Sequence, residues 1–185
     1  MSWIAEIEDF NGDADLRKVI ARIKTARGKV GNIMKAQTLH PRALEAHLQL
    51  YQCLMFEDGL LPQGEREMVA LVVSAANNCA YSVSHVADAL ANYESDNNKL
   101  REIIAGRQFL GMTHRQAKML RYAVKLTKQP DKVCKEDIAA LHEVGFKDRE
   151  ILEINLLTSY FNFANRIASG LGVQFDEDEI TGYKP

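Results

Sequence analysis

The chain has 185 residues, of which 46% are hydrophobic and 26% are charged, and its formal net charge is −2. A chain of this length buries enough apolar surface without disulfides, so we expect a single globular domain over residues 1–185. The near-neutral charge argues against nucleic-acid binding, and the longest apolar run, MVALVVSAA, is too short to span a membrane. The acidic N-terminus contains no secretion signal, and three widely spaced cysteines indicate the reducing cytoplasm.

Apolar residues recur at helical spacing along most of the chain. Pro41 and the capping residues Thr113 and Asp148 indicate helix starts, and Gly145 indicates a helix end. The expected helices, in chain order, cover residues 15–26, 41–55, 65–76, 79–93, 114–128, 135–145 and 149–172. No stretch alternates apolar and polar residues as a half-buried strand would. The predicted fold class is therefore all-α.

The helix expected over residues 65–76 is apolar on most sides, which predicts a central and buried position. Asn77 and Asn78 follow it. Because asparagine tolerates left-handed backbone geometry and caps helices, this pair predicts a corner between two helices. Cys79 is then expected in the first turn of the next helix, where the positive end of the helix dipole favours the thiolate. This makes Cys79 a candidate nucleophile.

Three other side chains could take part in chemistry at Cys79. Glu67 lies twelve residues earlier, on the helix expected to pair antiparallel with the helix of Cys79. Burial beside apolar residues would raise the pKa of Glu67 and make it a proton acceptor, while Tyr81 and His85 could donate hydrogen bonds. Structural interpretations stay open: Cys79 as a small core residue, Glu67 as an exposed first-turn glutamate, and His85 as a partly buried residue.

The segment GEREMVALVVSAANNCAYSVSHVADAL resembles the signature of the alkylhydroperoxidase/carboxymuconolactone decarboxylase family. The blocks on either side, which begin RGKVGNIMKAQ and YAVKLTKQP, are similar to the peroxidase-related branch of that family. The resemblance implies an AhpD-like helical bundle, assembly into homo-oligomers, and reduction of a small hydroperoxide by two cysteines in a C-x-x-C motif. It also implies a glutamate base, matched here by Glu67. Cys79 matches the first cysteine, and Tyr81 matches a tyrosine between the two.

Two positions depart from the family pattern, in which the second cysteine attacks the peroxide and the first resolves the sulfenic acid. Ser82 stands in place of the attacking cysteine, and Val86 stands in place of a histidine that relays protons. His85 precedes that position by one residue and, at about 100° per residue, faces Ser82 better than Cys79. Because a serine oxygen cannot cycle through a sulfenic state, the two-cysteine cycle is excluded within this motif.

A single-thiol peroxidase remains, in which Cys79 attacks the hydroperoxide with Glu67 as base and Tyr81 or His85 as proton donor. The resulting sulfenic acid would need a second thiol. Cys53 is expected in the core and Cys134 on the surface, and either of them or an external thiol reductant could supply it.

Two other functions stay open. The chain could be a descendant that has lost its chemistry and serves as an oligomeric scaffold. It could also be a cofactor-free lactone decarboxylase that uses Glu67, Ser82 and His85 as acid–base groups. The five histidines are far apart in the sequence, and no phosphate-binding or dinucleotide-binding motif is present, so no metal and no cofactor are expected.

Overall fold

The computed structural model describes residues 1–106 and 108–183. In this part of the chain all regular structure is helical, which confirms the predicted all-α class. The α-helices are α1 (Ala14–Arg27), α2 (Asn32–Lys35), α3 (Pro41–Met55), α4 (Gln63–Ala76), α5 (Ala80–Leu90), α6 (Asn97–Ala105), α7 (His114–Lys128), α8 (Lys135–Glu143), α9 (Asp148–Gly170) and α10 (Glu177–Ile180). Single 3-10 turns occupy Phe10–Gly12 and Pro130–Lys132.

The helices predicted from the sequence are all present, with ends within about three residues of the expected ones. Helix α7 has the predicted bounds, because a capping box between Thr113 and Gln116 fixes its start. Helices α2, α6 and α10 are absent from the sequence prediction. Helices α2 and α10 have four residues each, which is too short to show an apolar period, whereas α6 has nine residues, as many as the predicted α8, and was missed although it is amphipathic.

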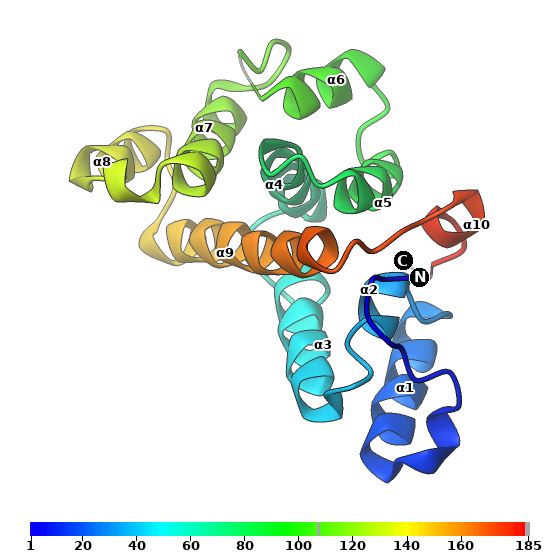
Figure 1. The fold of residues 1–185 in the computed structure, drawn as a ribbon. Coiled ribbons are helices and arrows are strands. Elements are labelled where there is room, and N and C mark those ends of the chain that lie inside the picture. Colours follow the sequence, from blue (N-terminus) through cyan, green and yellow to red (C-terminus); the bar gives the residue numbers. More distant parts are fainter. Residues whose placement is uncertain (107, 184–185) are drawn as a thin grey trace.

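Helix α4 lies at the centre of the bundle and contacts α5, α6, α7 and α9 (Figure 1). Every residue from Glu65 to Ser74 is buried, including the charged ones. The apolar side chains of α4 form one core cluster with side chains such as Leu120 of α7 and Leu157 of α9. The central position predicted for this helix is confirmed.

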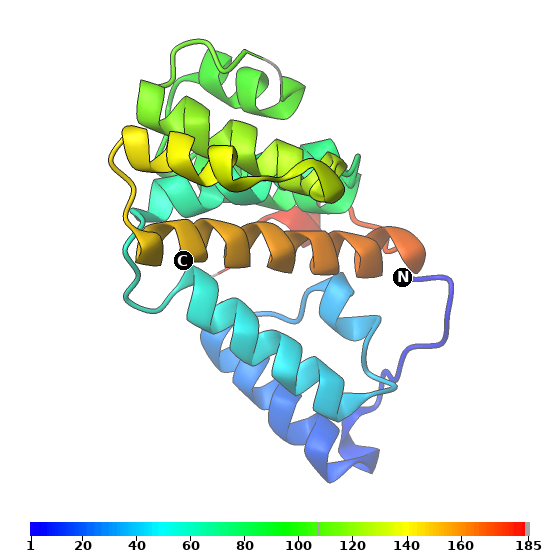
Figure 2. The same cartoon turned by 90° about the vertical axis from the view of Figure 1, so that its left-hand side faces the viewer.

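Helices α1 and α3 pack against each other and form a second unit, and α3 also contacts α9 (Figure 2). The two helices share an apolar cluster that includes Leu16, Val19, Ile20, Ile23, Leu44 and Leu48. Helix α1 ends at Gly28, whose φ of 82° is readily adopted only by glycine. This turn places Arg27 and Lys29 where the second unit meets α4, α5 and α9.

Arg66 fixes the loop that joins α3 to α4. Arg66 is 5% exposed, and its side chain donates hydrogen bonds to the backbone carbonyls of Leu61 at 3.0 Å and Glu57 at 2.9 Å. The guanidinium also forms an ion pair with Glu153 of α9, with 3.2 Å between Nε and Oε1. Glu153 in turn accepts the backbone N–H of Leu60 at 2.8 Å. The pair therefore joins the start of α4 to α9.

The corner between α4 and α5 has the predicted left-handed asparagine. Asn78 has a φ of 54°, and the backbone N–H of Cys79 donates to the carbonyl of Ser74 at 3.0 Å. Cys79, expected within the first turn, is instead the N-cap residue of α5, with an extended backbone. Its position is therefore one residue before the helix, although still at the helix N-terminus.

The chain ends in a segment over residues 174–183, here called the C-terminal strap, which includes α10. From the end of α9 the strap runs back past α5 to α2 (Figure 1). Asn32 donates its side-chain amide to the carbonyl of Gln174 at 3.0 Å, and Lys29 donates to the carbonyl of Glu179 at 2.8 Å. Separately, no helix within the described ranges is both long and apolar enough to cross a membrane.

Candidate active site

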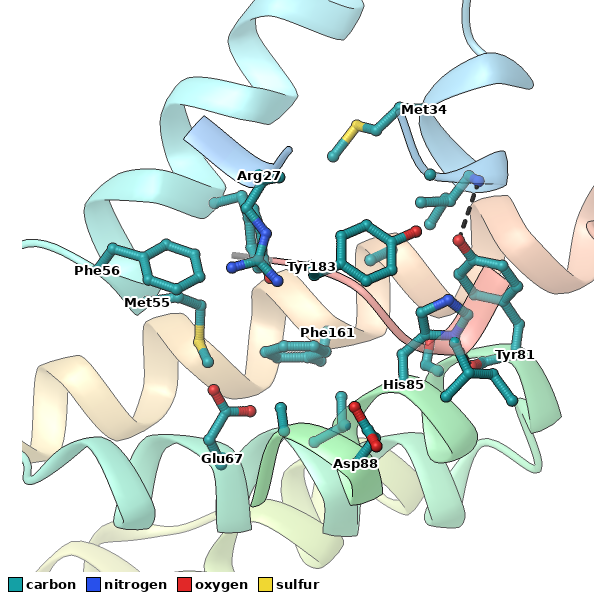
Figure 3. Close-up of a pocket in the computed structure, with 18 of the residues that line it drawn as sticks. Arg27, Met34, Met55, Phe56, Glu67, Tyr81, His85, Asp88, Phe161 and Tyr183 are labelled. Atoms are coloured by element: carbon teal, nitrogen blue, oxygen red, sulfur yellow. Dashed lines mark hydrogen bonds between the residues drawn. The ribbon is translucent and has the colours of Figure 1, made fainter. Parts of the chain in front are cut away.

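A cavity of about 340 Å³ lies where the α1–α3 unit, the α4–α5 pair, α9 and the C-terminal strap meet. Most of its wall is apolar or aromatic, and residues of all these elements line it. Two charged side chains face each other across it: Figure 3 shows Arg27 and Glu67 pointing inward from opposite walls, with Phe161 and Tyr183 beside them. The cavity therefore combines an apolar enclosure with a small number of polar groups, as ligand sites commonly do.

Glu67 is the acidic group of this cavity. Its side chain comes from the second turn of α4, is 6% exposed, and accepts a hydrogen bond from Gln63 Nε2 at 3.1 Å. Burial raises the pKa of Glu67 to about 7, against the smaller lowering effects of Gln63 and of the positive charges on Arg27 and Arg66. The exposed alternative for this residue is therefore wrong. A carboxyl that is half protonated near neutral pH can both give and take a proton.

Ser82, rather than Cys79, faces the cavity. Cys79 is 2% exposed and lies in a separate apolar cluster with Ala36 and Val173, outside the residues that line the cavity. Its thiol donates a hydrogen bond of 3.5 Å to Ser82 Oγ, and its sulfur accepts no capping bond from the first turn of α5. Among the described residues, no hydrogen bond joins Cys79 to Glu67. The expected grouping of thiol and base is therefore not what the structure brings together.

The side chains of Tyr81 and His85 contact the C-terminal strap, and neither forms a hydrogen bond with the thiol of Cys79 among the described residues. Glu179 Oε1 accepts hydrogen bonds from the hydroxyl of Tyr81 at 2.9 Å and that of Tyr183 at 3.1 Å. It also accepts the backbone N–H of Asn32 at 2.6 Å, and His85 Nε2 lies 3.8 Å away. Burial alone would raise the pKa of Glu179, but these four neighbours together lower it to about 2.

The two rings form one wall of the cavity. Tyr81 and His85 stack with centroids 4.2 Å apart, and His85 Nδ1–H donates to the carbonyl of Tyr81 at 2.7 Å. Sequence reasoning missed Glu179, since it lies about a hundred residues from its partners and no local pattern connects them. In the structure, Tyr81 and His85 therefore line the cavity and contact Glu179 of the C-terminal strap.

Replacing Glu179 with glutamine is expected to loosen the strap. The carboxylate contributes stability that is present above its ordinary pKa of 4.5 and is lost as the pH falls toward 2. At pH 7 we therefore expect faster hydrogen exchange over residues 174–183, together with a lower free energy of unfolding. Hydrogen-exchange mass spectrometry checks this, with the exposed Glu177→Gln as control. Unchanged exchange in Glu179→Gln would contradict the role given to this carboxylate.

The other two cysteines are not among the residues that line the cavity. Both Cys53 and Cys134 are exposed, and no disulfide joins the three cysteines. The core position expected for Cys53 is wrong, whereas the exposed position of Cys134 is confirmed. Desolvation and the carboxylate of Glu57 raise the pKa of Cys53, and a hydrogen bond with Glu136, with burial second, raises that of Cys134. Both therefore differ from Cys79, which is buried.

This arrangement predicts the outcome of thiol titration. We expect Cys53 and Cys134 to react with Ellman's reagent in the folded protein, and Cys79 to react only after unfolding in urea. The variant Cys79→Ala should show the same number of reactive thiols as the native chain when folded, and one reactive thiol fewer when unfolded. Rapid reaction of all three thiols in the folded protein would show that Cys79 is accessible.

Groups of three or more side chains able to hold a metal ion are absent from the described ranges.

Comparison with known proteins identifies the fold and shows a family similarity over part of the chain. Residues 41–125 match the family model of the carboxymuconolactone decarboxylase family. An uncharacterized peroxidase-related protein from Ralstonia eutropha JMP134, with an alkylhydroperoxidase AhpD core, is 29% identical; the alignment covers 97% of this chain and 94% of that one, with a TM-score of 0.85. A peroxidase-related protein from Silicibacter sp. TM1040 is 26% identical, with the same coverage and TM-score.

A more distant structure shares the fold alone. The debrominase Bmp8 is 18% identical, over 95% of this chain and 96% of its own, with a TM-score of 0.76. A search of curated proteins gave no significant match. The family match includes α4 and α5, which carry Glu67, Cys79 and Ser82, and the structural match extends over nearly the whole chain. Residues 41–125 of the chain are therefore similar to the carboxymuconolactone decarboxylase family, and the fold is the all-α fold of the alkylhydroperoxidase AhpD core.

Proposed function

We propose that this protein is an enzyme that transfers a proton to or from a small enolisable acid or lactone, with Glu67 as its acid–base group. The observation that carries the proposal is the Glu67 carboxyl, which is buried in the wall of the cavity with its pKa raised to about 7. A perturbed carboxyl in a cleft is a typical feature of a catalytic site, since catalytic pKa values are matched to the working pH.

The neighbours of Glu67 suit a reaction that develops negative charge. The positive charge of Arg27 lies on the opposite wall and acts on Glu67, and in that position it would stabilise an enolate or a carboxylate of the substrate. Ser82 Oγ accepts the thiol hydrogen of Cys79, which leaves the hydroxyl hydrogen of Ser82 for a carbonyl oxygen in the cavity. These groups support an enolisable acid or unsaturated lactone as substrate.

Decarboxylation of such a lactone acid is the reaction we propose first. The bond between the carboxylate and the ring carbon breaks, carbon dioxide leaves, and the electron pair moves onto the conjugated carbonyl oxygen. Glu67 then delivers its proton to the ring carbon, and water reprotonates Glu67. No oxidant, reductant or cofactor is consumed. Arg27 would hold the anion and Ser82 the carbonyl oxygen during this step.

A thiol peroxidase that works through Cys79 is the second candidate. The position of Cys79 at the N-terminus of α5 supports it, as does the hydrogen bond to Ser82, which lines the cavity. Two peroxidase-related relatives share the fold at 29% and 26% identity. Because Cys79 is 2% exposed, a hydroperoxide would reach the sulfur only if α5 or the C-terminal strap moved, and an external thiol would then reduce the sulfenic acid.

One pair of assays distinguishes the two proposed reactions from each other and from a scaffold protein that has lost its activity. The protein is given carboxymuconolactone, and release of carbon dioxide is followed; separately it is given cumene hydroperoxide with dithiothreitol. The first proposal predicts carbon dioxide release that survives in Cys79→Ala and is lost in Glu67→Gln. Peroxide consumption that is lost in Cys79→Ala would support the second candidate, and no turnover of either compound would support a scaffold role.

We also propose that the protein is a homo-oligomer. Helix α9 carries three exposed apolar side chains, Leu152, Leu156 and Phe163, whose surface would be covered in an assembly. Light scattering coupled to size exclusion tests this, and a monomer at high protein concentration would contradict it.

A further inference from the structure

A second polar site lies in the cavity, on the wall formed by α3 and α9. His47 of α3 and Tyr160 of α9 both line the cavity and are 3% and 5% exposed. A hydrogen bond of 2.8 Å joins His47 Nε2 to the Tyr160 hydroxyl, and Gln37 Oε1 lies 3.0 Å from His47 Nδ1. The reaction proposed above uses none of these three residues.

The backbone carbonyl of Ile33 fixes the direction of every hydrogen bond in this chain. A carbonyl oxygen can only accept, so Gln37 donates to it through Nε2, at 2.9 Å, and presents Oε1 to His47. His47 Nδ1 must then carry the ring hydrogen, which leaves Nε2 as an acceptor. Burial lowers the pKa of His47 to about 4, so the ring stays neutral near pH 7. The hydroxyl hydrogen of Tyr160 is therefore directed at His47.

The oxygen of Tyr160 is left with acceptor capacity only. Within residues 1–106 and 108–183, no donor to this oxygen is found, and its single hydrogen bond is the one it donates to His47. Tyr51 stacks beside it, with ring centroids 5.8 Å apart and an angle of 21° between the ring planes. A ligand in the cavity that lacked a donor would cover this oxygen without satisfying it, which costs binding free energy.

We infer that Tyr160 is the hydrogen-bond acceptor for the ligand, oriented by His47, and that the cavity selects flat, apolar molecules carrying a hydroxyl or N–H donor. The inference rests on the proposed function only in placing the ligand in this cavity. Glu67 takes no part in the selection. His47 is a positioning residue, since it acts through Tyr160.

Two probes of nearly equal shape test this selection. 2-Naphthol carries a hydroxyl donor, whereas 2-methoxynaphthalene has the same rings and no donor. We expect isothermal titration calorimetry at pH 6 to show 2-naphthol binding about three- to tenfold more tightly, the effect of one hydrogen bond. In Tyr160→Phe the ratio of the two affinities should fall to about one.

Further variants separate selection from general damage to the cavity. His47→Phe keeps the Tyr160 hydroxyl but releases its hydrogen to the ligand, so the ratio should fall toward one although the tyrosine is still present. Phe161→Leu removes apolar wall and should weaken both probes while leaving their ratio unchanged. Circular dichroism verifies that each variant folds. The ratio of the two affinities in the wild-type protein tests the inference without any variant.

The outcome is independent of the fate of the proposed reaction. Glu67→Gln should keep the preference for 2-naphthol even though it abolishes turnover, so a failure of the acid–base proposal leaves this test intact. Any of three results would overturn the inference. The ratio of the two affinities could be near one in the wild-type protein, it could be unchanged in Tyr160→Phe, or both probes could fail to bind.

Discussion

Replacing Glu67 with glutamine is expected to lower the rate of carboxymuconolactone decarboxylation by about 10²–10⁴-fold, the usual contribution of general acid–base catalysis. The amide keeps the shape of the side chain but cannot exchange a proton with the substrate. A matched control is Glu65→Gln, since Glu65 is the first residue of the same buried run and pairs with Arg115 outside the cavity. That variant should keep its rate within a few-fold. Comparable losses in both variants would contradict the assignment of Glu67.

The same carboxyl predicts an unusual dependence of stability on pH. Burial raises the pKa of Glu67 from its ordinary value of 4.5 to about 7, so the folded state holds a proton that the unfolded state has lost. Its contribution to stability is fully present below pH 4.5 and is lost as the pH rises through 7. The free energy of unfolding in urea should therefore be about 2–3 kcal/mol higher at pH 5 than at pH 8 from this group. Glu67→Gln should remove that difference.

Replacing Arg66 with methionine is expected to lower the free energy of unfolding by about 3–5 kcal/mol, the usual effect of breaking a buried ion pair. The change leaves Glu153 without its partner and leaves the carbonyls of Leu61 and Glu57 without their donor. Urea denaturation at constant pH measures the loss. The exposed Arg149 provides the control, and Arg149→Met should change stability by less than about 0.5 kcal/mol.

A second substitution tests why Arg66 matters. If the loss comes from an unpaired buried charge, Arg66→Met combined with Glu153→Leu should recover part of it, because no charge is then left unpaired. A double variant that is less stable than Arg66→Met would show that Glu153 acts mainly by holding the loop, through the backbone N–H of Leu60. A loss below about 1 kcal/mol in the single variant would contradict the role of Arg66.

Much of the fold follows from local features of the sequence. The bounds of α7 follow from the cap at Thr113 and from Pro130, and the all-round apolar character of α4 predicts its central position. The C-terminal strap does not follow from the sequence. Residues 174–183 are held by Glu179 through contacts with Tyr81, His85 and Asn32, all far away in the chain, and no local pattern encodes such pairing.

The candidate site was predictable only in part, because the prediction placed Cys79 inside the first turn of the helix that carries Tyr81, Ser82 and His85. Glu67 follows from its place on the buried helix α4. The spacing of about 100° per residue, from which the direction of Cys79 relative to its neighbours was predicted, applies only to helical residues. Cys79 precedes the first turn of α5. Its sulfur is consequently directed to Ser82 and into a separate apolar cluster, while Ser82 lines the cavity. Tyr160 belongs to α9, and only the packing of α9 on α3 brings it to His47.

The protonation of Glu67 is the point on which the acid–base account depends, and infrared spectroscopy can measure it directly. The carboxyl band of Glu67 is isolated as the difference between the spectra of the native protein and Glu67→Gln and is followed from pH 4 to pH 9. The account predicts half protonation near pH 7. Half protonation at or below pH 4.5 would mean that this carboxyl is ionised under working conditions and has no proton to give.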